Sequence, residues 1–140
     1  MPRQNEAGVT LIELMVVVAI VGILASIAVP SYRRYVLRTN RTDAVRSLTL
    51  NAQIMQRCYS QNFTFNLAAC TGPLAVLSAN GNYNLAVGNL ANNTYTLTAT
   101  PRLSQVQDTT CASFTLDQTG RQTALDTGNN DQSLVCWGAN

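Results

Sequence analysis

An apolar segment near the N-terminus constrains this chain more than any other feature. It runs from Val9 to Val29 and holds one charge, Glu13, in 21 residues. A membrane-spanning helix needs about 20 apolar residues, whereas the apolar core of a cleaved secretory signal has only about 7 to 15. The segment therefore predicts a transmembrane helix over residues 9–30. Residues 1–8 form a short polar peptide before it, and residues 31–140 are enough for one modest domain.

Glu13 is unusual here, because a carboxylate at membrane depth costs a few kcal/mol on insertion scales and such residues often mark a function. Either it stays hydrated at the interface, or it pairs with a positive group. If the chain were cut after Gly8, the new amine at Val9 would lie about 6 Å from Glu13 along the helix axis. That amine, in the same chain or in a neighbouring copy, is the expected partner.

Gly22 and Pro30 weaken the predicted helix. Glycine costs about 1 kcal/mol relative to alanine inside a helix, and proline removes a backbone hydrogen bond. Either the two residues only kink the helix, or they allow residues 22–30 to stretch or melt during assembly or under load.

These residues together resemble the signature of the type IV pilin family. Residues 8–14, GVTLIEL, are similar to the family's cleavage glycine, apolar helix and glutamate at the fifth mature position, and Gly22 and Pro30 fall where the family has its helix-loosening residues. The resemblance implies that residues 1–8 are a prepilin leader, which a prepilin peptidase cuts between Gly8 and Val9 before it methylates the new N-terminus. Val9 departs from the family, since most members have phenylalanine there.

An apolar stripe predicts that the helix resumes after Pro30 and ends near Tyr59, which gives one helix of about 50 residues with the anchor. The stripe consists of Val45, Leu48, Ala52, Met55 and Tyr59. Beyond it we expect an irregular connection over residues 61–82 and strands over 83–87, 94–100, 112–117 and 121–124, with a turn at 118–120. A loop at 126–131 and a last edge strand at 134–137 complete the prediction. The fold class is therefore α+β, with the long helix packed on a small antiparallel sheet.

Four cysteines lie in the second half of the chain, at Cys58, Cys70, Cys111 and Cys136. They lack the close spacing of zinc ligands, so they favour two disulfides over free thiols or a metal site, and they place this half outside the reducing cytoplasm. Of the three pairings we expect the sequential one, Cys58–Cys70 and Cys111–Cys136. The second pair also matches the C-terminal loop of type IV pilins, and the surrounding residues 111–120 resemble PilE-type minor pilins as well as DNA-uptake pilins.

Arginines concentrate in the predicted second half of the helix, where residues 33–57 hold six arginines and one acid. This basic surface is either solvated or contacts lipid headgroups or other subunits. The positive-inside rule would place the chain after the apolar segment in the cytoplasm, but the cysteines and the leader indicate the opposite side. Two further arginines, Arg102 and Arg121, are candidate DNA contacts, although phosphate binding usually needs more of them.

Several classes of enzyme and cofactor are excluded by composition. The chain has no histidine, and all nine of its basic residues are arginines, so histidine-based catalysis and lysine chemistry are absent. We therefore expect neither an enzyme nor a cofactor. Asp126 and Asp131 lie in an oxygen-rich loop where calcium is conceivable, but a solvated turn is the favoured interpretation.

The predicted function is that of a minor pilin, a structural subunit of a type IV pilus. The resemblance implies other pilin subunits, a prepilin peptidase and an assembly platform as partners. It also implies residence in the inner membrane before assembly and in the extracellular pilus afterwards. Two alternatives stay open, a minor pilin that is a receptor for DNA uptake and a pseudopilin of a type II secretion system.

Overall fold

The computed structural model of the chain describes residues 8–138. Its principal element is helix α1 (Leu11–Asn62), which has 52 residues and no interruption at Pro30. The chain divides into two compact units, one up to Val36 and one from Leu37 onward, and each is described by itself.

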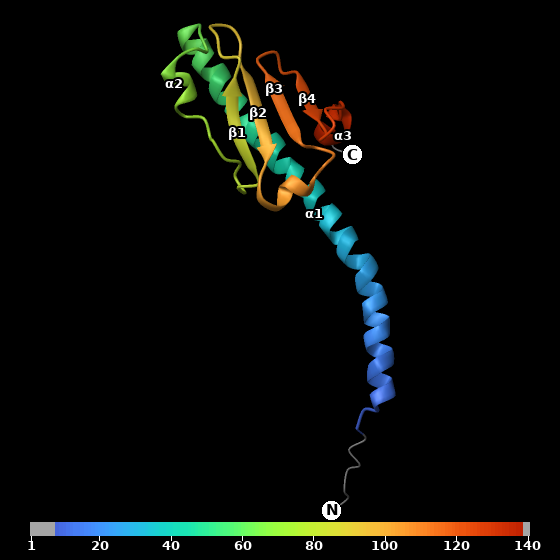
Figure 1. Cartoon of the computed structure of the whole chain (residues 1–140). Helices are drawn as coiled ribbons and strands as arrows, with labels where there is room; N and C mark the ends of the chain where they lie inside the picture. The colour runs from blue at the N-terminus through green and yellow to red at the C-terminus, as the bar shows by residue number, and fades with distance from the viewer. Residues whose placement is uncertain (1–7, 139–140) are drawn as a thin grey trace, which may run out of the picture. The chain divides into compact units, whose positions relative to one another are not determined.

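The first unit is the apolar part of α1 (Figure 1). It is the one helix among residues 8–138 that is long and apolar enough to cross a membrane. From Val9 to Val29 its large apolar side chains, among them Ile12, Leu24 and Ile27, are more than half exposed. An isolated helix that exposes apolar side chains on every face needs lipid or other helices around it.

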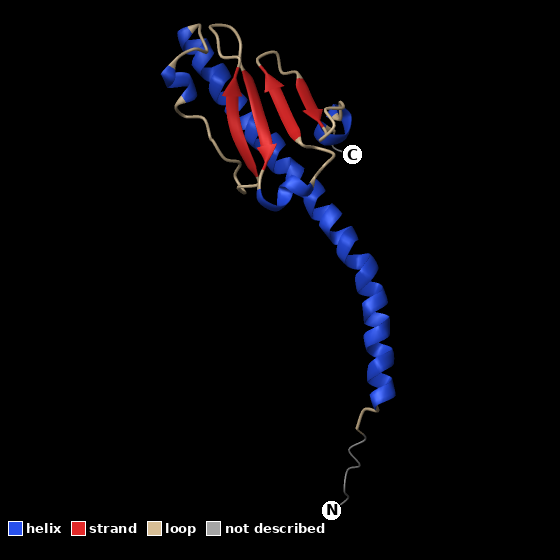
Figure 2. Cartoon of the chain, in the orientation of Figure 1, coloured by secondary structure: helices blue, strands red, loops and turns tan. Residues whose placement is uncertain are grey.

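The second unit is a four-stranded antiparallel sheet with the rest of α1 against one face (Figure 2). The strands β1 (Tyr83–Gly88), β2 (Thr96–Pro101), β3 (Ser113–Asp117) and β4 (Gln122–Leu125) follow each other in chain order. Buried and less buried residues alternate along β2 and β3, as a sheet with one covered face requires. This is the α+β architecture that the sequence predicts.

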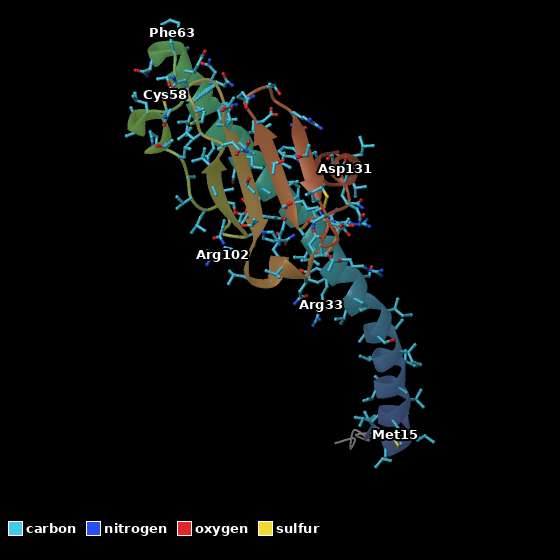
Figure 3. All side chains as sticks on the ribbon, turned by 45° about the horizontal axis from the view of Figure 1, so that its top comes forward. Met15, Arg33, Cys58, Phe63, Arg102 and Asp131 are labelled. Atoms are coloured by element: carbon cyan, nitrogen blue, oxygen red, sulfur yellow. A yellow bond between two sulfur atoms is a disulfide. The ribbon has the colours of Figure 1, made fainter. Side chains whose placement is uncertain are left out.

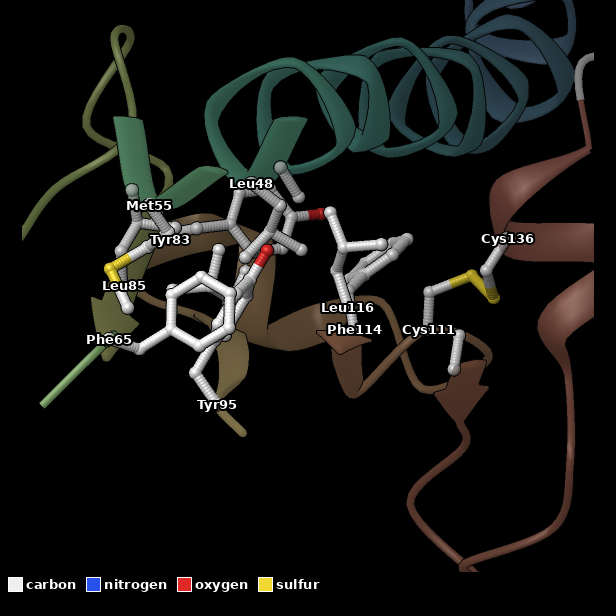
Figure 4. Close-up of a cluster of buried hydrophobic side chains, with 14 of the residues drawn as sticks. Leu48, Met55, Phe65, Tyr83, Leu85, Tyr95, Cys111, Phe114, Leu116 and Cys136 are labelled. Atoms are coloured by element: carbon white, nitrogen blue, oxygen red, sulfur yellow. A yellow bond between two sulfur atoms is a disulfide. The ribbon is translucent and has the colours of Figure 1, made fainter. Parts of the chain in front are cut away.

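The core lies between the helix and the covered face of the sheet (Figure 4). Leu48 and Met55 of the predicted stripe are fully buried, and they meet Tyr83, Tyr95 and Phe114. The other three stripe residues pack against this cluster and are partly buried. Two disulfides, Cys58–Cys70 and Cys111–Cys136, flank the core, with Cα–Cα distances of 5.3 and 5.9 Å.

The predicted edge strand at residues 134–137 is wrong, because the chain forms a short helix there, α3 (Ser133–Trp137). The Asp131 carboxylate accepts the Ser133 N–H at 2.9 Å and so begins the helical turn, and the Trp137 indole N–H donates to the Thr123 carbonyl at 2.8 Å. The sequence LVCW also lacks the strict alternation that a half-buried strand needs, since Leu134 and Val135 are both exposed.

Three smaller differences concern the connections. The segment expected to be irregular contains a four-residue helix, α2 (Ala68–Thr71). Strand β2 begins at Thr96 rather than at Thr94, because the Thr94 carbonyl accepts the Ala91 N–H and its hydroxyl donates to the Asn89 carbonyl. A 3-10 helix, η1 (Leu103–Gln107), follows β2.

Candidate functional site

The N-terminal end of α1 is a capping box built from Thr10 and Glu13. The Thr10 backbone N–H and hydroxyl both donate to Glu13 Oε2 at 2.8 Å, and the Glu13 N–H donates back to Thr10 Oγ1 at 3.3 Å. This reciprocal pattern satisfies two backbone donors that have no partner within the helix. The sequence carries the pattern as Thr-x-x-Glu over residues 10–13, so local spacing alone encodes this cap.

The cap fixes where the Glu13 carboxylate points. It is folded back toward the start of the helix, beside the residue that would carry the amine after cleavage. Both bonds that Thr10 donates end on Oε2, so a further donor can approach Oε1. A shallow apolar groove lies beside this carboxylate, lined by Val9, Ile12, Val16 and Val17. The N-terminal end of the first unit therefore combines a carboxylate that points toward Val9 with an apolar surface.

Gly22 and Pro30 lie inside an intact α1. No atom outside the local helix lies within 4 Å of the position that a Cβ on Gly22 would occupy, so packing does not require a glycine there. Pro30 lacks the N–H that would continue the helical hydrogen bonds. The helix is therefore continuous through both residues, although each lowers its intrinsic helical propensity.

One arginine of the basic segment is withdrawn from the surface. Arg41 pairs with Asp108 through two bonds, Nε to Oδ2 at 2.7 Å and Nη2 to Oδ1 at 2.8 Å. The side chains of Arg41 and Asp108 are only 12% and 3% exposed. No local sequence pattern links these two residues, because they are 67 residues apart.

A buried glutamine extends this pair into a network. The Gln105 amide donates to the Leu37 carbonyl at 3.0 Å and to Asp108 Oδ2 at 3.3 Å, and it accepts the Asn40 amide N–H at 3.1 Å. Since Gln105 belongs to η1, the network attaches η1 to the first turn of α1 in the second unit.

The remaining arginines of α1 are free of such contacts. Arg41–Asp108 is the one side-chain ion pair among residues 8–138. Arg38 lies in a groove of about 770 Å³ between α1 and α3, where its neighbours include Thr42, Val135 and Trp137. The positive charge of α1 is therefore available to a partner at several exposed positions, which are Arg33, Arg34, Arg38, Arg46 and Arg57.

The two arginines proposed as DNA contacts do not lie together. Arg102 follows the last residue of β2, whereas Arg121 lies in the β3–β4 turn beside the first residue of β2. Six residues of strand at about 3.3 Å each separate these ends by roughly 17 Å. Arg102 and Arg121 therefore belong to different ends of the sheet and cannot form one compact phosphate contact.

The carboxylates of the acidic loop at residues 126–131 accept hydrogen bonds from nearby backbone N–H groups. Asp126 Oδ1 accepts the N–H groups of Gly128 and Asn130 at 2.7 and 2.9 Å, and hydrogen bonds from the Asn130 side chain hold the pKa of Asp126 below its usual value. The part of the chain that the structure describes contains no group of three or more metal-ligating side chains. These contacts are those of a capped turn.

Comparisons with known proteins match both parts of the chain. Residues 30–115 match the family described as "Type IV minor pilin ComP, DNA uptake sequence receptor", and residues 3–29 match the "Prokaryotic N-terminal methylation motif". The fimbrial protein EcpC of Eikenella corrodens is 35% identical over 107 residues, which cover 76% of this chain and 69% of EcpC. A fimbrial protein of Pseudomonas aeruginosa is 57% identical over 44 residues, 31% of this chain but only 29% of that protein.

A solved structure resembles the chain as well. The non-core minor pilin PilV of Neisseria meningitidis superimposes with a TM-score of 0.57 at 26% identity, covering 69% of this chain and 93% of PilV. The similarity thus includes the arrangement of helix and sheet in addition to the N-terminal signature.

Proposed function

Because the chain belongs to the type IV minor pilin family, we propose that it is made with the leader 1–8, cut between Gly8 and Val9, and packed into a pilus through residues 9–30. The observation that carries this proposal is the N-terminal end of α1, where Glu13 is capped and directed beside Val9 on a helix of exposed apolar side chains. Residues 31–140 form the globular domain outside the membrane.

Assembly exchanges one apolar environment for another. Before assembly, lipid covers the exposed side chains of the helix, so the hydrophobic effect changes little when helices of neighbouring subunits replace it. Close packing then supplies cohesion, and the shallow groove at Val9, Ile12 and Val16 offers a surface for it. Apolar packing by itself does not fix the register, which is the axial position of one helix relative to its neighbour.

Glu13 supplies the missing register. Its Oε1 receives the N-terminal amine of a neighbouring subunit, while Thr10 keeps Oε2 in place. A buried ion pair adds little net stability compared with apolar packing, but one charge left without its partner costs about 3 to 5 kcal/mol. The pair therefore penalises every register except the matched one. Gly22 and Pro30 allow the helix between them to extend as subunits pack.

The partners follow from this role. They are other pilin subunits, the prepilin peptidase that removes the leader, and a membrane platform that inserts the subunit. The protein resides in the inner membrane first and in the pilus at the cell surface afterwards. Its role is structural and not enzymatic, and no cofactor takes part.

Mass spectrometry of sheared pili tests the processing step. We expect an N-terminus at Val9 that carries a methyl group, and four oxidised cysteines. Chains that start at Met1 within sheared filaments would contradict the proposal. A Gly8→Leu variant, which alters only the cleavage residue, should stay in the membrane fraction at full length.

DNA binding is a second candidate function, because the matching family is described as a DNA uptake sequence receptor. The exposed arginines of α1 offer more positive charge than Arg102 and Arg121, which lie at opposite ends of the sheet. A gel-shift titration of the full chain in nanodiscs at increasing salt tests it. Binding that weakens steeply with salt supports phosphate contacts, and absence of binding at low salt refutes the role.

A further inference from the structure

We propose that η1 and the residues around it form a lipid-binding surface, which rests on the anionic headgroups of the membrane before the subunit is assembled. The key juxtaposition is that of exposed Leu103 and Val106 with Arg102. They lie at the end of the second unit that contains Leu37, because Gln105 of η1 donates to the Leu37 carbonyl. This inference goes beyond the pilin function but depends on the proposed residence of residues 9–30 in the membrane.

The length of the chain keeps this surface near the membrane. Residues 9–29 form about 31 Å of helix, which matches a hydrocarbon core of about 30 Å. Val29 then lies at the edge of the core, and eight further residues of α1, about 12 Å at most, lead to Leu37. Gln105 of η1 is bonded to the Leu37 carbonyl. The headgroup region is about 5 to 7 Å thick, so Leu37 lies at most about 5 to 7 Å beyond its outer edge, which long side chains next to η1 can bridge.

The side chains of η1 suit such a surface. Leu103 is 72% exposed and Val106 is 58% exposed. Leu103 also has φ +54°, a left-handed conformation that is rare and costly for a bulky residue. The fold thus holds an apolar side chain outward at an energetic cost.

Charge favours the same partner. Arg102 and Arg38 lie on this end of the unit, and the one acid of the neighbouring network, Asp108, is already neutralised by Arg41. Arg33 and Arg34 precede the unit in α1 and are exposed. Each arginine near an anionic leaflet contributes about 1 kcal/mol of attraction. The strand register also brings Asp126 and Asp131 to this end of the sheet, because Leu125 at the end of β4 pairs with Ser113 and the Thr127 N–H donates to the Thr109 carbonyl. The positive charge here therefore comes from the arginines of α1 together with Arg102, which outnumber these two acids.

A matched control exists at the opposite end of the same unit. Phe63 is 79% exposed and also has φ +54°, but it follows the last residue of α1 (Figure 3). It lies 26 residues beyond Leu37, about 39 Å along the helix. Leu103 and Phe63 are therefore both large, exposed apolar residues with the same backbone conformation, and they differ in their distance from Leu37, the first residue of the unit.

Fluorescence quenching in nanodiscs tests the inference with the full chain. Single copies of the Leu103→Trp, Phe63→Trp and Ile20→Trp variants are placed in phosphatidylethanolamine–phosphatidylglycerol discs of two kinds. In one kind the lipids carry bromine near the headgroup end of the acyl chains, which reports on positions 103 and 63. In the other they carry bromine near the terminal methyl groups, which reports on position 20. The signal of native Trp137 is subtracted from each. We expect several-fold stronger quenching for Leu103→Trp than for Phe63→Trp, and a decrease when zwitterionic lipid replaces phosphatidylglycerol.

The outcomes separate this inference from the pilin function. Quenched Ile20→Trp with equal signals at positions 103 and 63 overturns the lipid surface and leaves the membrane anchor intact. Unquenched Ile20→Trp overturns the anchor and the surface together. Quenching at position 103 that ignores phosphatidylglycerol refutes the role of the arginines. Because each disc holds one copy, contact with a neighbouring subunit cannot cause the expected difference in quenching between positions 103 and 63.

Discussion

Replacing Arg41 by alanine should destabilise the globular unit strongly. The substitution leaves the Asp108 carboxylate, whose side chain is 3% exposed, with only the longer bonds from the Gln105 amide at 3.3 Å and the Cys111 N–H at 3.4 Å. Removing one partner of a buried ion pair costs about 3 to 5 kcal/mol. We expect the lower end, about 3 kcal/mol, because the 12% exposure of Arg41 shows that water reaches the site.

The assay is thermal and urea unfolding of the detergent-solubilised full chain, followed by the fluorescence of Trp137. For a domain of about 100 residues, each kcal/mol lowers Tm by about 4 to 8 °C, so a decrease of at least about 12 °C is expected. Arg38→Ala is the matched control, since Arg38 lies three residues earlier on the same helix and is exposed; its effect should stay within about 0.5 kcal/mol. Equal Tm values for the two variants would refute the reasoning. An Arg41→Met, Asp108→Leu double variant should recover part of the loss.

Three further predictions concern a disulfide, the capping carboxylate and pH. Replacing both Cys111 and Cys136 by serine removes a disulfide with a sequence separation of 25, and it should lower the free energy of unfolding in urea by about 3.5 kcal/mol. Removing Cys58–Cys70, whose separation is 12, should lower it by about 2.8 kcal/mol. Glu13→Gln keeps the capping box but removes the charge, so it should insert into membranes normally and fail to enter sheared pili; normal incorporation would show that the charge is dispensable. The Thr119 hydroxyl lowers the pKa of Asp117, so this contribution to stability is complete above the unfolded pKa of about 3.9 and is lost as pH falls through the lower folded value. Urea midpoints between pH 6 and 3 should therefore depend less on pH in Asp117→Asn, and an unchanged pH dependence would contradict the assignment.

The sequence alone was enough for the features that depend on local pattern. Composition and length identify the apolar segment from Val9 to Val29, and periodicity identifies the stripe of α1 and the strands. Such features are readable because helices and strands repeat every 3.6 and 2 residues, and because membrane spanning depends on length and polarity. The capping box at Thr10 and Glu13 was equally readable, since its two members are three residues apart.

Tertiary structure decided what depends on residues distant in the chain. The basic segment of α1 looks uniform in sequence, yet Asp108 takes Arg41 out of it, and the register of β2 and β3 sends Arg102 and Arg121 to opposite ends of the sheet. The helix over Ser133–Trp137 is held against the sheet by the Trp137 indole N–H, which donates to the Thr123 carbonyl 14 residues away. The packing of the helix on the sheet brings such partners together, and their spacing along the chain does not predict that they will meet.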